Sequence, residues 1–215
     1  MSYKPSLWQK ITSCIYPYNL EKVESEISGT LEVNLQYGTI VIDSPKANYS
    51  FGNLHIVFRE ALYAINLDLK KQHKVLVLGF GAGNIAHILY NEMHLNCSIT
   101  GIELDIEMIE LGKKYYAPNL FKRSKIIIAD AFEYIKTQTE TYDLILVDIF
   151  IDTKTPEKFQ TEVFFEALKK ALNTNGQILM NTMTENFLTK KNWEKTFKSN
   201  KYISVQENEV LHFKK

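Results

Sequence analysis

Apolar positions alternate with polar ones along residues 20–43, and the alternation is interrupted at two glycines. The positions on one side of this pattern are Val23, Ser25, Ile27, Leu31, Val33, Leu35, Tyr37, Ile40 and Ile42. A period of two is typical of half-buried strands. Gly29 and Gly38 stand where hairpin turns would join such strands. The pattern therefore predicts a small antiparallel meander.

From residue 53 the pattern first becomes helical and then alternates between short apolar runs and helical segments. Residues 53–68 place their apolar side chains on one helical face. The apolar runs are 74–79, 98–103, 125–129, 143–148 and 177–182, and the helical segments between them lie at 84–94, 105–116, 131–138 and 157–172. Strand–helix alternation of this kind predicts a mostly parallel sheet with helices on both faces.

The last part of the chain departs from this alternation. After a predicted helix at 189–199, two strand-like runs, KYISVQ and EVLHFK, are separated by only two residues. Two residues cannot form a parallel crossover, so these strands should be antiparallel. We therefore expect an α/β fold, a Rossmann-like methyltransferase sheet that is mostly parallel and ends in an antiparallel hairpin, in residues 51–215. Residues 1–50 would form an N-terminal segment with the small antiparallel β-meander.

Composition narrows the classes of partner. The 215 residues include 25 basic and 25 acidic side chains, a balance that argues against electrostatic capture of nucleic acid or of an anionic membrane. The first residues, MSYKPSLWQK, contain no apolar run of signal-peptide type, and no stretch is long and apolar enough to span a bilayer. The two cysteines and five histidines show no metal-ligand spacing. We expect a cytoplasmic protein with a small-molecule partner and no metal.

Glycines follow the first apolar run of the predicted parallel sheet. In such sheets ligands bind beyond the carboxyl ends of the strands. Residues 79–83 read GFGAG, and their glycines would permit a tight turn and a close approach of a ligand to the backbone. A helix starting at Asn84 would direct its first amides at an anionic group. A simple strand-to-helix turn is the alternative interpretation.

Acidic residues end the next three runs. Glu103 lies about 20 residues past the glycines, where an acid can reach a ribose diol. Asp130 would accept a hydrogen bond from an adenine amino group, although with Glu133 it also forms a helix capping box. Asp148 would face the reacting end of a cofactor, as a general base or as a group that orients a substrate amine. Asp152, four residues on, is the weaker candidate.

These features together predict an adenosyl-cofactor site. The catalytic candidate is Asp148, and the cofactor-binding candidates are Gly79, Phe80, Gly81, Ala82, Gly83, Glu103, Leu104, Asp130, Ala131 and Asp148. NAD is the nearest competing cofactor, but its fingerprint needs a third glycine where Asn84 stands.

Four segments resemble, in order, the motifs of spermidine synthases, which belong to the class I S-adenosylmethionine-dependent methyltransferase superfamily. The segments are KVLVLGFGAGN, GIELD, IADAF and YDLILVD, and the resemblance runs from about residue 20 to 182. It implies that Glu103 binds ribose, Asp130 lies near adenine and Asp148 is the catalytic base. It also implies S-adenosylmethionine, or its decarboxylated form, as cofactor.

Three departures from the family pattern concern groups that would bind a cationic amine. An Asp of the family's glycine motif is Ala82 here, the DSSDP segment is replaced by DIFID at 148–152, and a Tyr and a Glu are replaced by Phe51 and Asn53. A polyamine would lose hydrogen-bond acceptors at these positions. We therefore expect a methyltransferase with an unknown small-molecule acceptor, with polyamine aminopropyl transfer as the alternative. A non-catalytic adenosyl-binding module and a homodimeric assembly stay open.

Overall fold

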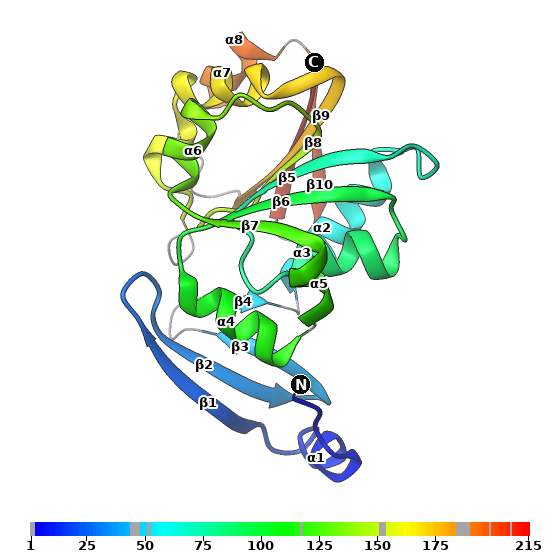
Figure 1. Cartoon of the computed structure of the whole chain (residues 1–215), viewed down its shortest axis with the longest axis vertical. Helices are drawn as coiled ribbons and strands as arrows, with labels where there is room; N and C mark the ends of the chain where they lie inside the picture. The colour runs from blue at the N-terminus through cyan, green and yellow to red at the C-terminus, as the bar shows by residue number, and fades with distance from the viewer. Residues whose placement is uncertain are drawn as a thin grey trace.

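The computed structural model describes residues 3–43, 48–50, 53–116, 118–150, 154–183, 190–197, 199–206 and 208–215. The described strands form two sheets, which Figure 1 shows one above the other. A four-stranded sheet has the order β1-β2-β3-β4, and a seven-stranded sheet has the order β10-β11-β9-β8-β5-β6-β7.

The smaller sheet is the predicted meander, extended by one short strand. Its strands are β1 (Tyr18–Ser25), β2 (Gly29–Gln36), β3 (Thr39–Asp43) and β4 (Asn48–Ser50), each antiparallel to the next. Gly29 and Gly38 have φ angles of 69° and 74° at the two hairpin turns, as the pattern predicted. The helix α1 (Leu7–Thr12) precedes the sheet and begins with a capping box formed by Ser6 and Gln9.

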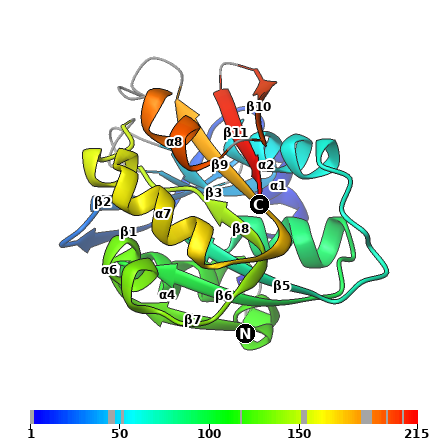
Figure 2. The same ribbon diagram turned by 90° about the horizontal axis from the view of Figure 1, so that it is seen from above.

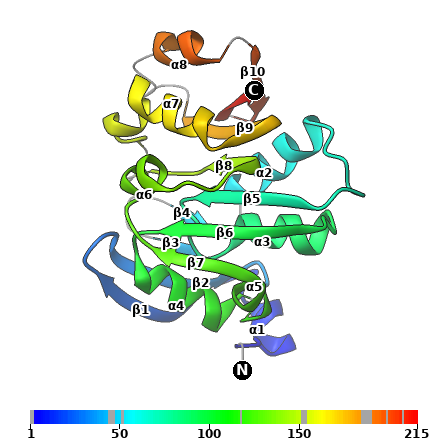
Figure 3. The ribbon, with the colours of Figure 1, turned by 45° about the horizontal axis from the view of Figure 1, so that its top comes forward.

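The larger sheet confirms the predicted topology. Its parallel strands are β5 (His73–Leu78), β6 (Cys97–Glu103), β7 (Ser124–Ile128), β8 (Tyr142–Val147) and β9 (Leu172–Met183). Figure 3 shows them side by side from β9 to β7. The strands β10 (Ser199–Val205) and β11 (Asn208–Lys214) form the expected antiparallel hairpin, with β11 also antiparallel to β9.

Helices cover both faces of this sheet (Figure 1, Figure 2). One face packs against α2 (Asn53–Ala64), α3 (Asn84–His87) and a π-helix (Ile88–Glu92), and the other packs against α6 (Ala131–Thr137), α7 (Glu162–Lys170) and α8 (Lys190–Thr196). Alternate residues of β5 enter the two cores: Val75 and Val77 enter the first, and Leu76 and Leu78 enter the second. The period of two in a doubly covered strand explains why β5 reads as one continuous apolar run.

The meander packs against α4 (Ile106–Tyr115), which follows β6 of the large sheet. Leu31, Val33 and Leu35 of β2 are fully buried in a cluster that includes Met108 and Leu111 of α4. Burial of this face stabilises the small sheet, which has no second layer of its own. The division of the chain into two domains at residue 50 stays a prediction.

The structure corrects the helix predictions at three places. The helix expected at 157–172 is a 3-10 turn (Glu157–Gln160) followed by α7, because Thr161 is extended and its hydroxyl accepts from Phe164 N. The helix expected at 53–68 ends at Ala64, and the short helix α5 (Pro118–Arg123) was not predicted. Among the described residues, no helix has both the length and the apolar character needed to cross a membrane.

Candidate functional site

The glycine loop between β5 and α3 is held against the end of β6. The amides of Gly79 and Phe80 both donate to the carbonyl oxygen of Ile102, at 3.0 Å. Gly79, Gly81 and Gly83 have φ angles of 83°, 55° and 93°, a region that favours glycine. The glycines are therefore required by the backbone path and not only by a ligand.

Two of these glycines have very different surroundings. A Cβ atom on Gly79 would collide with the backbone carbonyl of Asp148, whose amide donates to Leu78 O at 2.9 Å. The glycine loop and the end of β8 are therefore in direct contact. A Cβ atom on Gly81 would meet nothing within 4 Å among the described residues. Gly81 thus borders open space at the carboxyl end of the sheet.

Glu103 ends β6 and holds the loop by its carboxylate. One oxygen accepts from Gly81 N at 2.7 Å, and the other accepts from Leu104 N at 2.8 Å and Asp105 N at 2.9 Å. Burial raises the pKa of Glu103, and these three amide donors oppose the rise. Because a carboxylate can accept about four hydrogen bonds, capacity remains for a ligand hydroxyl.

The side chains of two other loop residues point into cores. Phe80 is 2% exposed and packs on Gly101 and Phe121. Ala82 is 1% exposed and belongs to the cluster between the meander and α4. These residues would contact a ligand at this site only through their backbone. The side chain of Leu104, in contrast, is 44% exposed.

Asp130 follows β7 and caps α6, whose first residue is Ala131. One oxygen accepts from Phe132 N at 2.9 Å and Glu133 N at 3.2 Å, and the other pairs with the ammonium of Lys158. Burial alone would raise the pKa of Asp130, but the hydrogen bonds from Lys158 and the two amides lower it below its usual value. The capping role predicted for Asp130 is confirmed.

Asp148 is half-buried at the end of β8. Burial raises its pKa to about 7, and the negative charge of Glu103 adds to the rise, whereas a hydrogen bond from Asn181 opposes it. The Asn181 amide donates to Asp148 Oδ1 at 3.2 Å from the neighbouring strand β9. A carboxyl group with a pKa near 7 can exchange a proton at neutral pH.

The strand ends bring most of the predicted residues to one edge of the sheet. Gly79 touches Asp148, Gly81 is bonded to Glu103, and Ala129 N donates to Glu103 O at 2.9 Å, which places the start of α6 beside β6. Asp152, the weaker candidate, and Phe51, one of the departures from the family pattern, lie outside the described residues.

Sequence reasoning missed two polar residues of this edge. Asn181 directly follows the apolar residues Ile178, Leu179 and Met180 near the end of a predicted strand, which was an available signal. Lys158 lies in the turn before α7, and nothing in the pattern distinguishes it from a solvated lysine. Among the described residues, no group of three His, Cys, Asp or Glu side chains could hold a metal ion.

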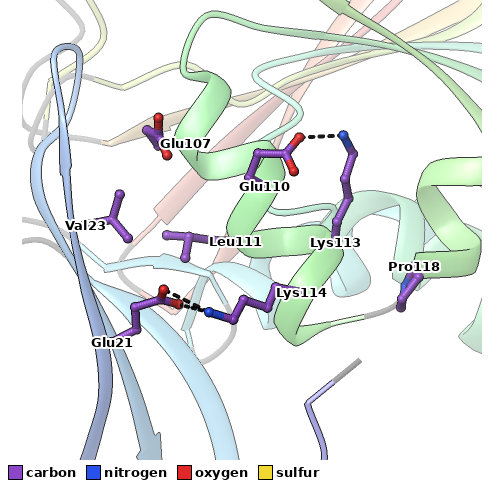
Figure 4. Close-up of a pocket in the computed structure, with 8 residues that line it drawn as sticks. All are labelled: Glu21, Val23, Glu107, Glu110, Leu111, Lys113, Lys114 and Pro118. Carbon is purple, nitrogen blue, oxygen red and sulfur yellow. Dashed lines mark hydrogen bonds and ion pairs between the residues drawn. The ribbon is translucent and has the colours of Figure 1, made fainter. Parts of the chain in front are cut away.

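A separate groove of about 440 Å³ lies between β1 and α4 (Figure 4). Its lining residues are Glu21, Val23, Glu107, Glu110, Leu111, Lys113, Lys114 and Pro118. Lys114 pairs with Glu21 and Lys113 pairs with Glu110, so its two lysines are already neutralised. None of the strand-end residues lines this groove, so we do not regard it as the candidate site.

Solved structures of low sequence identity share the fold. The chain is 20% identical to a probable spermidine synthase from Corynebacterium glutamicum, with a TM-score of 0.71 over 90% of this chain and 79% of that one. It is 21% identical to human methyltransferase-like protein 13 in complex with SAH, with a TM-score of 0.64 over 76% of this chain and 82% of that one. These likenesses show a Rossmann-like methyltransferase fold.

Curated relatives carry one activity in their names. The chain is 28% identical over 166 residues to a polyamine aminopropyltransferase from Saccharolobus solfataricus, which covers 74% of this chain and 55% of that protein. It is 34% identical over 121 residues to polyamine aminopropyltransferase 2 from Aquifex aeolicus, which covers 50% of this chain and 23% of that protein. The chain thus spans about half the length of the first of these relatives. A model of the spermine/spermidine synthase domain matches residues 56–210, and the chain belongs to this family.

Proposed function

We propose that the chain transfers an aminopropyl group from decarboxylated S-adenosylmethionine to an amine acceptor. The observation that carries this proposal is the half-buried carboxylate of Asp148, which has a pKa of about 7 and belongs to a residue whose backbone lies against the glycine loop. Membership of the spermine/spermidine synthase domain family and the names of the relatives favour aminopropyl over methyl transfer. The methyltransferase expected from the sequence is therefore the second candidate.

The residues of the strand ends suit an adenosyl group. Glu103 has acceptor capacity left for a ribose hydroxyl, and the open space at Gly81 lets a ligand approach the backbone. The exposed side chain of Leu104 offers an apolar surface for a base. Asp130 is ionised at neutral pH, since its pKa is below the usual value, and can accept from an adenine amino group.

The chemistry required of the protein is positioning and removal of one proton. When bound, the donor supplies a carbon activated by a sulfonium leaving group. The attacking amine forms a bond from nitrogen to that carbon, and the electron pair of the carbon–sulfur bond stays on sulfur as a neutral thioether. Asp148 accepts the proton that the new secondary amine loses. Because the glycine loop lies against the backbone of Asp148, a donor bound to the loop would place its reacting carbon near this residue.

Methyl transfer remains the second candidate because of Ala82. This residue replaces the family's amine-binding carboxylate, and its methyl group is buried against the meander cluster. Methyl transfer would not require the protein to bind the amine of the donor strongly. The two candidates share the same adenosyl site and the same base.

An assay with both donors distinguishes the two candidates, and it does not require the natural acceptor to be identified beforehand. The protein is incubated with each donor and a panel of amines that includes putrescine, and the nucleoside by-products are measured by mass spectrometry. Aminopropyl transfer yields 5′-methylthioadenosine, and methyl transfer yields S-adenosylhomocysteine. We expect 5′-methylthioadenosine together with an aminopropylated amine. S-adenosylhomocysteine as the only product, or no turnover of either donor, would contradict the proposal.

The same assay tests the role of Asp148. Because its folded pKa is about 7, the ionised base is lost as the pH falls below that value, and the rate should decrease toward acidic pH. Asp148→Asn should lower kcat by about 100-fold or more, and the remaining rate should no longer decrease toward acidic pH. A variant that kept the wild-type rate and pH profile would exclude Asp148 as the base.

A further inference from the structure

Asn181 is a buried polar side chain whose amide nitrogen is hydrogen-bonded and whose amide oxygen is not, among the described residues. It lies in β9, is 1% exposed, and follows Ile178, Leu179 and Met180, each of which is fully buried. Its amide nitrogen donates to Asp148 Oδ1. Its oxygen, Oδ1, has no hydrogen-bond partner in the part of the chain that the structure describes.

An unsatisfied buried acceptor destabilises a folded protein, so its presence calls for a reason. The next residue shows the usual arrangement: Thr182 is equally buried, and its hydroxyl donates to Glu209 O at 2.9 Å. Asn181 differs from Thr182 because its free acceptor lies beside the Asp148 carboxylate. The two side chains together present acceptors to a donor group that the protein itself does not supply.

The charge around this pair selects the kind of donor. Asp148 makes no ion pair with a described Lys, Arg or His, and the negative charge of Glu103 lies close enough to raise its pKa. A region with two carboxylates and no countercharge favours a cation. A primary ammonium group has three N–H donors, enough for Asp148 and Asn181 Oδ1 at once.

We propose that Asn181 Oδ1 and the Asp148 carboxylate together bind a primary ammonium group of the substrates, with Asn181 as a specificity-determining residue. The inference rests on the proposed function. It provides hydrogen-bond acceptors for an amine, which the side chain of Ala82 lacks. The ammonium belongs either to the aminopropyl chain of the donor or to the acceptor amine. Both sources offer the same chemistry, and binding measurements distinguish them.

The test compares Asn181→Leu with Thr182→Val, a neighbouring buried polar residue that serves as matched control. Calorimetry measures the affinity for 5′-methylthioadenosine, which has no ammonium group, and for decarboxylated S-adenosylmethionine, which has one. Steady-state kinetics give the KM for the acceptor amine. In Asn181→Leu, affinity for 5′-methylthioadenosine should be unchanged. Loss of one charge-assisted hydrogen bond should weaken the ammonium ligand by about tenfold or more.

The two sources of the ammonium give different results. If it belongs to the donor, affinity for decarboxylated S-adenosylmethionine falls; if it belongs to the acceptor, its KM rises while donor affinity stays the same. Donor affinity and acceptor KM that both match Thr182→Val would overturn the inference. Should the leucine variant not fold, Asn181→Asp, of the same shape, should increase the preference for the ammonium ligand, and an unchanged preference would likewise overturn it.

Failure of the proposed function has its own signature. If the wild type binds 5′-methylthioadenosine but transfers no aminopropyl group, that function is wrong, and the ammonium site is then judged from the two binding affinities alone. If the wild type binds no adenosyl ligand, both proposals are wrong.

Discussion

Gly79 and Gly81 both need a positive φ angle, but only Gly79 is packed against another part of the described chain. The backbone at both has a positive φ angle. A Cβ on Gly79 would collide with the chain at Asp148, whereas one on Gly81 would point into open space. At Gly81 the positive φ angle favours glycine but no described neighbour excludes a side chain, so a closely bound ligand would be a second reason to keep the space free.

This contrast predicts different effects of two alanine substitutions. Gly79→Ala should lower the free energy of unfolding by about 3 kcal/mol or more, because the end of β8 must move. Gly81→Ala should cost only about 1 kcal/mol of backbone strain, yet weaken binding of 5′-methylthioadenosine by about tenfold. Denaturant unfolding and calorimetry measure the two effects. Wild-type affinity in a folded Gly81→Ala protein would show that no ligand approaches there.

Individual residues were only partly predictable from the sequence. Glu103 and Asp148 could be located because they end apolar runs whose carboxyl ends meet at one edge. The contact between Gly79 and Asp148 could not, since it joins residues far apart in the chain. The ion pair between Asp130 and Lys158 was also beyond prediction, because it depends on the path of the turn before α7.

At the scale of elements, the meander is hydrogen-bonded to the segment that follows β6, beside the candidate site. Asp105 is 3% exposed, and its Oδ2 accepts from the hydroxyls of Ser25 and Ser28, both at 2.6 Å. Its other oxygen accepts from Glu107 N at 2.9 Å at the start of α4. A single side chain therefore joins the first hairpin of the meander to the residues that follow Glu103.

Removal of both serine hydroxyls should weaken this junction. The double substitution Ser25→Ala and Ser28→Ala leaves Asp105 Oδ2 buried without a donor, and the free energy of unfolding should fall by about 2 kcal/mol. Thr30→Val on the same hairpin breaks only an exposed hydrogen bond to Glu24 and should change it by less than about 0.5 kcal/mol. Equal unfolding curves for the two proteins would show that the junction contributes nothing.

The strands of the large sheet were predictable, because doubly buried strands read as apolar runs between glycines and polar turns. The helix at 157–172 was predicted as one piece because Phe159 and Phe164 are both buried, so the apolar stripe continues across the break. The break comes from the local hydrogen bond of Thr161, which competes with the helical pattern. The short helix α5 was missed because six residues carry too little periodicity.

At the scale of the whole molecule, the order of the strands creates the site. From β5 the chain continues to β6 and β7 on one side, and it then crosses to β8 on the other side of β5. The strand order therefore reverses at β5, which is where open parallel sheets bind ligands. The glycine loop, Glu103 and Asp148 all lie at this position, and we propose that residues around Ala82 and Asn181 determine which group is transferred.

The central claim is that this edge of the sheet binds an adenosyl group, and calorimetric titration with 5′-methylthioadenosine tests it most directly. We expect saturable binding to the wild type, and about tenfold weaker binding to Glu103→Gln, which loses the charge that a ribose hydroxyl would contact. Thermal unfolding shows that both proteins are folded. No measurable heat from the folded wild type at millimolar ligand, or equal affinity in both proteins, would contradict the account.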